Sequence, residues 1–380
     1  MSLILAVYFL LYSLMHLYVC LKARRAYRFG IKTEIFFAVF MTAMVFAPVI
    51  VRLSENAGHA YFARLMAYTG YTWMAALFLF FSISVFIDFC RLCIYAAGRM
   101  SKKDFSPVLY AHKCFFVVPL MCSLSIVAYG YHEAGQIKTE HLIIHTDKIP
   151  KEIKRLKIVQ ISDIHLGLIV RQESLEKITY EIRKINPDIL VSTGDIVDGQ
   201  INHINEFVDP LKNINPPYGK FAVTGNHEFY AGIEASLDFM RKAGFKVLRG
   251  VSITAGGVIN IAGVDDAAGR PYKHAGISEN VLLSGLPKGY FTVLLKHKPV
   301  VDRAAIGLFD LQLSGHTHKG QIFPFNFITK LFFPMYNGFF KLSDVSYLYV
   351  SRGSGTWGPP VRFLASPEIT VIELVNTSLN

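Results

Sequence analysis

No cysteine follows residue 122 in this chain of 380 residues. All five cysteines lie in or beside apolar runs of the first part of the chain: Cys20, Cys90, Cys93, Cys114 and Cys122. This distribution excludes disulfides and thiolate metal sites from the later part. Any metal site there has to use nitrogen and oxygen ligands.

Acidic residues are scarce in the first part. Residues 1–130 contain 12 Lys and Arg but only four Asp and Glu, whereas the remainder contains 27 against 24. The net charge of +11 therefore comes mainly from the first part. Because the later part is nearly balanced in charge, a nucleic-acid partner is not implied.

Apolar residues make up 52% of the chain, which is too many for one soluble domain of this length. They gather in four long runs, at residues 3–21, 35–51, 71–97 and 115–130. About 20 mostly apolar residues are enough for a helix to cross a bilayer. We therefore predict a transmembrane region of four helices over residues 1–130 and a second domain over residues 131–380, in a multi-pass protein of the cell membrane.

The basic residues between these runs predict the topology. The loop after the first run contains Lys22, Arg24, Arg25, Arg28 and Lys32, and the loop after the third run contains Arg99, Lys102, Lys103 and Lys113. The loop after the second run contains only Arg52 and Arg64. Basic loops stay in the cytoplasm. Both ends of the chain, and with them residues 131–380, are therefore expected on the extracytoplasmic side.

Residues 131–380 alternate between strand-like and helix-like segments. Apolar segments suited to strands lie at residues 140–146, 156–162, 188–193, 220–225, 257–264, 290–296, 308–314 and 347–353, and residues 173–185 have helical spacing. This alternation predicts an α/β domain with two sheets and helices outside them.

Polar residues follow five of these strand segments directly. They are Asp163 and His165; Asp195 and Asp198; Asn226 and His227; His297; and His316 and His318. Because ligands bind at the carboxyl ends of strands in α/β sheets, we expect these side chains to meet at one edge. Such oxygen and nitrogen ligands suit divalent Mn, Fe, Zn or Ni.

The number of ligands points to more than one ion. Seven exceed what one tetrahedral ion requires, and they suit two ions that share a bridging carboxylate. Two ions about 3.5–4 Å apart stabilise the attacking and leaving oxygens of a phosphoryl displacement and lower the pKa of a bridging water. We therefore predict a phosphoesterase in which a hydroxide bridging two ions attacks phosphorus.

Five blocks of the sequence also resemble a known family. "SDIH", "GDIVDG", "GNHE", the single His297 and "GHTH" resemble, in this order, the signature blocks of the calcineurin-like metallophosphoesterases, over residues 137–376. The stretch "YLYVSRGSGTWGPPVRFLASPEITVIEL" is similar to the bacterial membrane-anchored phosphodiesterase branch. The resemblance implies an αββα sandwich with a site for two divalent ions at one end. Manganese is the first choice, with Fe, Zn and Ni as alternatives.

The resemblance also implies a role for each residue. The first ion would be held by Asp163, His165 and His318, the second by Asn226, His297 and His316, and Asp195 would bridge them. His227 would act as a general acid or as a donor to the transition-state oxygen, and Asp198 would orient it. Asp198 could instead be only a turn residue before Gly199.

Gly199 departs from the pattern of the protein-phosphatase branch, which has a phosphate-binding arginine at this position. The missing clamp argues against a phosphoprotein substrate. Arg352 and Lys298 are candidate replacements.

An aromatic stretch, "IFPFNFITKLFFPMYNGFFKL", follows "GHTH" at residues 322–342. It could form a groove for acyl chains or dip into the bilayer. Alternatively, it packs on its own domain or against the membrane helices.

The sequence thus predicts a membrane-embedded phosphoesterase for a phosphodiester or pyrophosphate, with a lipid-linked substrate as one option. Related membrane-anchored enzymes cleave UDP-diacylglucosamine, but that lipid is made on the cytoplasmic side, which conflicts with the predicted topology. The alternatives are a broad phosphodiesterase for soluble nucleotides and a non-catalytic metal-binding membrane sensor. The complete ligand set and the retained His227 argue against the sensor. The oligomeric state is left open.

Overall fold

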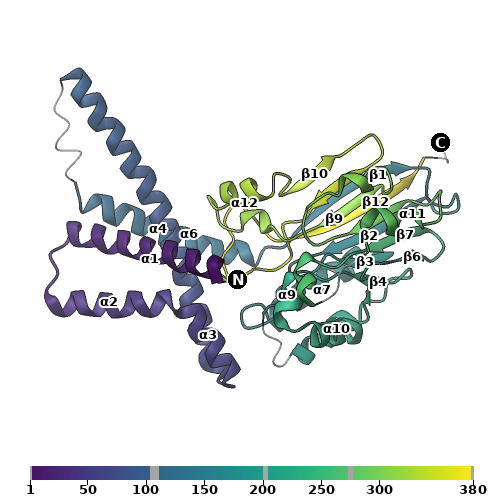
Figure 1. The fold of residues 1–380 in the computed structure, drawn as a ribbon, viewed down its shortest axis with the longest axis horizontal. Helices are drawn as coiled ribbons and strands as arrows, with labels where there is room; N and C mark the ends of the chain where they lie inside the picture. Colours follow the sequence, from purple (N-terminus) through teal and green to yellow (C-terminus); the bar gives the residue numbers. More distant parts are fainter. Residues whose placement is uncertain (1, 103–110, 200–203, 273–276, 378–380) are drawn as a thin grey trace. The chain divides into compact units, whose positions relative to one another are not determined.

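The computed structural model describes residues 2–102, 111–199, 204–272 and 277–377 (Figure 1). The chain divides into two compact units. The first consists of residues 1–132 with the segment Gly358–Val361, and the second contains the remainder from Glu133 onward.

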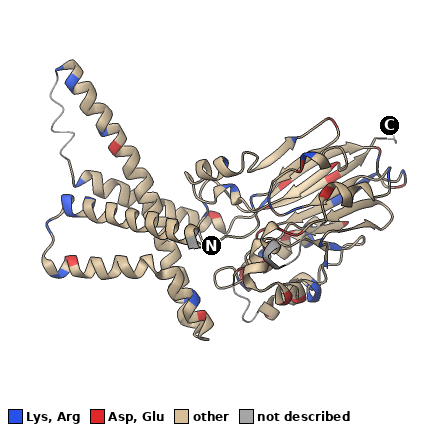
Figure 2. Cartoon of the chain, viewed as in Figure 1, with Lys and Arg blue, Asp and Glu red and all other residues tan. Residues whose placement is uncertain are grey.

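The first unit is helical. Its helices in the described residues are α1 (Ser2–Ala26), α2 (Ile31–Val45), α3 (Ala47–Asn56), α4 (Ala60–Ser101) and α6 (Cys114–Ala134). The last two residues of α6 belong to the second unit, which begins at Glu133. Within the described residues, three helices are long and apolar enough to cross a membrane, and the bent pair α2 and α3 would make a fourth span. Charged side chains are few along these helices, and Lys and Arg lie near the connection between α1 and α2 (Figure 2).

The single helix predicted over residues 35–51 is two helices, bent by 58° at Phe46. Pro48 in the first turn of α3 explains the break. Proline has no N–H, and its ring collides with the carbonyl group four residues earlier, so it can begin a helix but not continue one. Of the basic residues used to predict the topology, Lys103 lies outside the described residues.

The described residues of the second unit form two six-stranded sheets. The first has the order β1 (Lys138–Thr146), β12 (Glu368–Asn376), β2 (Arg155–Ile161), β3 (Ile189–Ser192), β4 (Lys220–Ala222) and β5 (Lys246–Val247). The second has the order β10 (Gly338–Lys341), β11 (Tyr347–Val350), β9 (Leu311–Ser314), β8 (Thr292–Leu295), β7 (Ile259–Gly263) and β6 (Val251–Ala255).

Helices lie outside both sheets. They are α7 (Gln172–Ile185), α8 (Val208–Lys212), α9 (Asn226–Ala231), α10 (Ile233–Lys242), α11 (Glu279–Ser284) and α12 (Asn326–Phe332). Short 3₁₀ turns cover Ile204–Phe207, Ala267–Tyr272, Arg303–Ala305 and His318–Gly320.

Three apolar cores separate these layers. Ile158 and Leu313 belong to the core between the sheets, Leu175 of α7 to the core over the first sheet, and Leu283 of α11 to the core over the second. The unit is therefore the predicted αββα sandwich.

Parallel pairing gathers the strand ends. The strands β2, β3 and β4 pair in parallel in the first sheet, as do β7, β8 and β9 in the second. The carboxyl ends of neighbouring parallel strands lie at one edge of each sheet, so the loops that follow them can share a site.

Candidate metal centre

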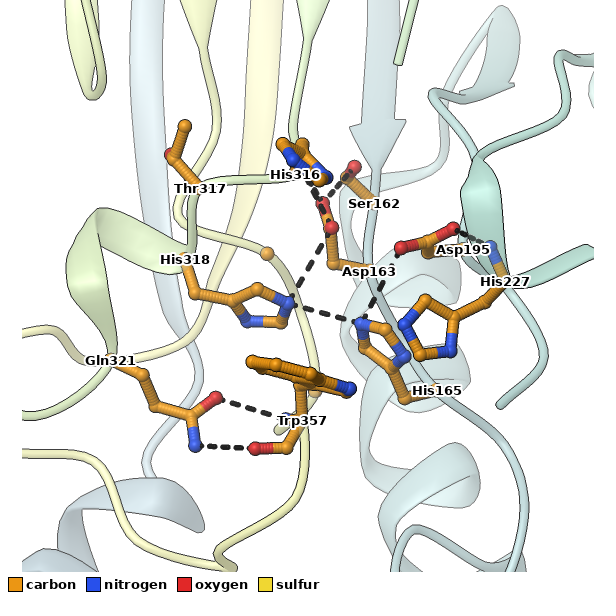
Figure 3. A network of polar contacts seen from close by, with 12 residues as sticks. Ser162, Asp163, His165, Asp195, His227, His316, Thr317, His318, Gln321 and Trp357 are labelled. Atoms are coloured by element: carbon orange, nitrogen blue, oxygen red, sulfur yellow. Dashed lines mark hydrogen bonds and ion pairs between the residues drawn. The ribbon is translucent and has the colours of Figure 1, made fainter. Parts of the chain in front are cut away.

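The loops after five strands bring the predicted ligands together. Asp163 and His165 follow β2, Asp195 follows β3, Asn226 and His227 begin α9 after β4, His297 follows β8, and His316 and His318 follow β9. Figure 3 shows six of these residues converging. All of them are buried except His316, which is half-buried.

Asp163, His165 and His318 form the first group, with ligand atoms all within 4.8 Å of one another. Nε2 of His318 lies 3.0 Å from Nε2 of His165 and 3.5 Å from Oδ1 of Asp163 (Figure 3). The group contains one carboxylate and two imidazoles.

Asp195, His297 and His316 form the second group, again within 4.8 Å. Nε2 of His297 lies 3.2 Å from Oδ2 of Asp195, 3.1 Å from Nδ1 of His316 and 3.2 Å from Oδ1 of Asn226. The Asn226 amide oxygen thus lies where it could add a fourth ligand atom.

Asp195 connects the two groups. Its Oδ2 atom, which faces His297, also lies 3.8 Å from Nε2 of His165 in the first group. A carboxylate in this position can reach an ion on either side.

The protonation of the histidine rings is compatible with binding of metal cations. Burial lowers the pKa of His316 to about 2 and also lowers that of His318, so both rings are neutral and offer a lone pair.

Burial also opposes the charged form of His297, but Asp195 and Asp163 outweigh it and raise the pKa of His297 to about 10. The charges that favour a proton on this ring favour a metal cation in its place. Nδ1 of His297 lies 2.8 Å from the Thr193 carbonyl oxygen, to which it can donate, and this leaves Nε2 as the free ligand atom.

The backbone of the ligand loops has an unusual conformation. Asp163, His165, Asp195, His316 and His318 all have positive φ angles, between 47° and 72°. Such angles cost non-glycine residues about 1–3 kcal/mol each and cluster at functional sites. Close packing adds a second constraint, because a Cβ atom on Gly225 would overlap Oδ1 of Asp195.

His227 lies beside the ligands. Its Nδ1 atom is 3.0 Å from Oδ1 of Asp198, and its backbone N–H donates to Oδ1 of Asp195 at 2.8 Å. Burial opposes its charged form, yet Asp195 and Asp198 raise the pKa of His227 to about 9. The Asp198 carboxylate thus lies at the His227 ring, which the family resemblance says it orients. A residue that served only to form the turn would not need this contact.

The sequence analysis missed Glu228, a buried carboxylate behind the ligands. It accepts hydrogen bonds from the backbone N–H groups of Asp195 at 3.0 Å, Ile196 at 2.8 Å and Gly225 at 2.6 Å. It therefore holds the loop that carries Asp195. Its place in "GNHE", next to His227, is the signal that could have identified it.

Arg362 is a second residue that the sequence analysis missed. It is completely buried, it donates to the backbone oxygen of His318 at 3.1 Å, and a guanidinium nitrogen lies 2.9 Å from Nδ1 of the same ring. It therefore fixes the orientation of His318. Since it lies 44 positions away along the chain, no local pattern indicates this contact.

The two candidate replacements for a phosphate clamp are engaged elsewhere. Arg352 pairs with Glu368 at 2.9 Å and Glu140 at 2.5 Å, and Lys298 pairs with Asp266 at 3.0 Å. A substrate phosphate would have to compete with these carboxylates.

Aromatic rings border the ligands. The ring centres of Phe333 and His316 are 5.1 Å apart, and those of Trp357 and His227 are 6.1 Å apart. The Gln321 side chain donates to the backbone oxygen of Trp357 at 2.8 Å and accepts from its N–H at 2.9 Å (Figure 3). Trp357 is thereby held in place although its side chain is exposed.

Comparisons with known proteins identify the family of the chain. The model of the calcineurin-like phosphoesterase family matches residues 156–320. A metallophosphoesterase of Aquifex aeolicus is 41% identical over 249 residues, which cover 65% of this chain and 95% of that protein. One from Campylobacter jejuni is 31% identical over 350 residues, covering 92% of this chain and 90% of the relative.

A relative from Danio rerio, a transmembrane protein with a metallophosphoesterase domain, is 31% identical over 271 residues, covering 68% of this chain and 62% of that protein. The five ordered blocks, the sandwich and these matches agree. The chain belongs to the calcineurin-like phosphoesterase family of metal-dependent phosphoester hydrolases.

Proposed function

We propose that this chain is a membrane-embedded phosphoesterase that binds two divalent ions and hydrolyses a phosphodiester or pyrophosphate bond in a lipid-linked substrate. The position of Asp195 carries the proposal, because its Oδ2 atom faces both groups of ligands. Asp163, His165 and His318 would hold one ion, and Asn226, His297 and His316 the other. Two such ions would neutralise charge on the phosphoryl group and make water more acidic, with manganese as the first choice.

His227 is proposed to protonate the leaving oxygen. Asp198 lies at Nδ1 of the ring, so Nε2 is the nitrogen that remains for the substrate. Both carboxylates near the ring favour its protonated form, which is the form that a general acid requires.

The side chains around the ligands favour diesters and pyrophosphates over phosphomonoesters. A monoester carries an extra negative charge that a guanidinium clamp would neutralise. Gly199 stands at the clamp position, and Arg352 and Lys298 are paired with acids. A diester, and each phosphorus of a pyrophosphate that is esterified at both ends, carries a single charge and needs such a clamp less.

The apolar surroundings support a lipid-linked substrate. The part of the chain that the structure describes has three or four helices that could span a membrane, and Phe333 and Trp357 border the candidate ligands. If the second unit is extracytoplasmic, as the basic loops predict, the substrate lies in the outer leaflet.

A broad phosphodiesterase for soluble nucleotides is the second candidate. The exposed indole of Trp357, held beside His227, favours it, because an aromatic face can stack on a nucleobase.

An assay of the purified full chain tests both candidates. The substrates are bis-p-nitrophenyl phosphate, p-nitrophenyl phosphate, a nucleotide diester and a lipid pyrophosphate, each with Mn, Zn, Mg or Ni. We expect metal-dependent hydrolysis of the diester and the lipid pyrophosphate, and slow hydrolysis of the monoester. A preference for the nucleotide would favour the second candidate, and turnover without added or bound metal would contradict both.

A further inference from the structure

The helix α12 directs its apolar side chains outward. Among its seven residues, all of them described, only Thr329 is buried. Leu331 is 81% exposed, Phe332 74% and Phe327 61%, and Ile328 is exposed as well. A surface helix of a soluble domain turns such residues toward the core, so α12 is built for an apolar environment outside its own unit.

Neighbouring segments extend this surface. Phe323 and Phe325 precede α12 and are exposed, and so is Leu364. Leu364 lies next to them because the Phe323 N–H donates to the Phe363 carbonyl at 3.2 Å. We call Phe323, Phe325, α12 and Leu364 together the apolar rim.

The apolar rim adjoins the candidate metal centre. Phe333, which directly follows α12, places its ring centre 5.1 Å from that of His316. Gln321, two residues before Phe323, holds the backbone of Trp357 beside His227. The apolar rim is therefore directly adjacent to the candidate metal ligands.

The covalent connection to α6 restricts what can cover the rim. Only residues 135–137 separate the end of α6 from the start of β1. Three residues span at most about 10 Å, so the second unit stays close to any membrane that α6 crosses. Lys330 is an exposed cation within α12. Its long side chain can reach lipid phosphates while the apolar neighbours face the acyl chains.

We propose that the apolar rim inserts into the interfacial layer of the bilayer and that the lipid-linked substrate reaches the metal centre along it. The route of the substrate rests on the proposed function. The insertion itself does not.

Fluorescence quenching by brominated lipids tests the insertion. The chain has two tryptophans, so Trp73→Phe with Trp357→Phe gives a background into which Leu331→Trp or Phe327→Trp is introduced. The full chain is reconstituted in phosphatidylcholine brominated high on its acyl chains. Interfacial helices lie about 5–10 Å deep, so both rim variants should lose most of their emission relative to unbrominated lipid.

Val281→Trp in the same background is the matched control. Val281 is an exposed apolar residue of α11, which lies away from α12 in the second unit (Figure 1). Its emission should change little. Equal quenching at all three positions would overturn the insertion. An absence of quenching in the rim variants would also overturn it, and this is the result expected if other parts of the protein cover the rim.

The outcome is separable from that of the proposed function, because quenching requires no turnover. Quenching in the rim variants, together with no phosphoester hydrolysis by the unmodified chain, would retain the insertion and overturn the proposed function. Hydrolysis without quenching would overturn the insertion alone. Since Leu331 and Phe327 are both exposed, agreement between the two variants guards against misfolding of either one.

Discussion

Asp195 is the residue on which both groups of candidate ligands depend. Asp195→Asn keeps the size of the side chain and removes its charge, so two cations would lose the carboxylate between them. Loss of a residue that only orients a ligand costs about 10–100-fold in metal affinity or activity, and loss of a bridging ligand should cost more. We expect the variant to lose most of its metal, measured by elemental analysis, and nearly all turnover.

Asp238→Asn is the control for this change, because Asp238 lies on α10 and pairs with Lys242 at 2.7 Å. It should keep both metal and turnover. Metal content and turnover that survive Asp195→Asn would refute the two-ion centre.

His227 should separate metal binding from proton transfer. His227→Asn should keep the bound metal but slow turnover by about 10²–10⁴-fold, the usual contribution of a general acid. The loss should be largest for esters with poor leaving groups, because these need the proton most. The measurement is kcat across phenyl phosphodiesters of increasing leaving-group pKa, with metal content determined in parallel. Loss of metal with no leaving-group dependence would instead make His227 a ligand.

Gly225 tests the close packing behind Asp195. In Gly225→Ala the new methyl group would overlap the Asp195 carboxylate, and overpacking of this kind typically costs about 1–3 kcal/mol. We expect a lower Tm and reduced metal content. In Gly199→Ala the methyl group would meet nothing within 4 Å, so this variant should resemble the unmodified protein. If the two variants behave alike, packing at Gly225 does not constrain the ligand.

At the level of residues, the convergence of the candidate ligands could be predicted from the sequence, because their positions depend on local structure. The ligands follow strands, and parallel strands deliver their ends to one edge whatever the details of the loops. Glu228 and Arg362 were missed because their roles depend on backbone groups that only the folded chain brings near.

Among the elements, α12 carries the clearest consequence for substrate choice. Leu331→Ser combined with Phe332→Ser removes two exposed apolar side chains. If these contact lipid, kcat/KM for a lipid pyrophosphate should fall relative to that for a soluble diester by about tenfold, which corresponds to about 1.4 kcal/mol. Phe333 is left unchanged, because its ring lies against His316.

Val281→Ser on α11 is the control and should leave this ratio unchanged. If the double variant lost activity equally toward both substrates and also lost stability, the stretch would be packing inside the protein. A soluble nucleotide would then be the better candidate.

The predicted strands cover eight of the strands in the described part of the second unit and miss four. The strand segments with local apolar patterns correspond to β1, β2, β3, β4, β7, β8, β9 and β11. The short strands β5 (two residues), β6 and β10 at the sheet edges were not predicted, and neither was β12, which lies inside the first sheet between β1 and β2. The chain returns to this place after building the second sheet, and no local periodicity encodes such a return. The break at Pro48, in contrast, was visible in the sequence and was overlooked because the run is uniformly apolar.

For the whole molecule, the distribution of basic residues predicts the side of the membrane. A reporter active only outside the cytoplasm, fused after Asn380, should be active, because Lys22, Arg24 and Arg25 and the basic residues near Arg99 hold their loops inside. A cytoplasmic reporter at the same position is the control and should be inactive. The reverse result would place the metal centre in the cytoplasm and make a nucleotide-linked lipid the leading substrate.

The position of β12 also determines when the second unit can close. β1 is the first strand of the second unit, but the strand it pairs with in the described structure is β12, along all nine of its residues. During synthesis β1 therefore has to remain without that partner until the ribosome has made residues 368–376. Until then β2 also lacks its neighbour on that side, because β12 lies between β1 and β2 in the first sheet.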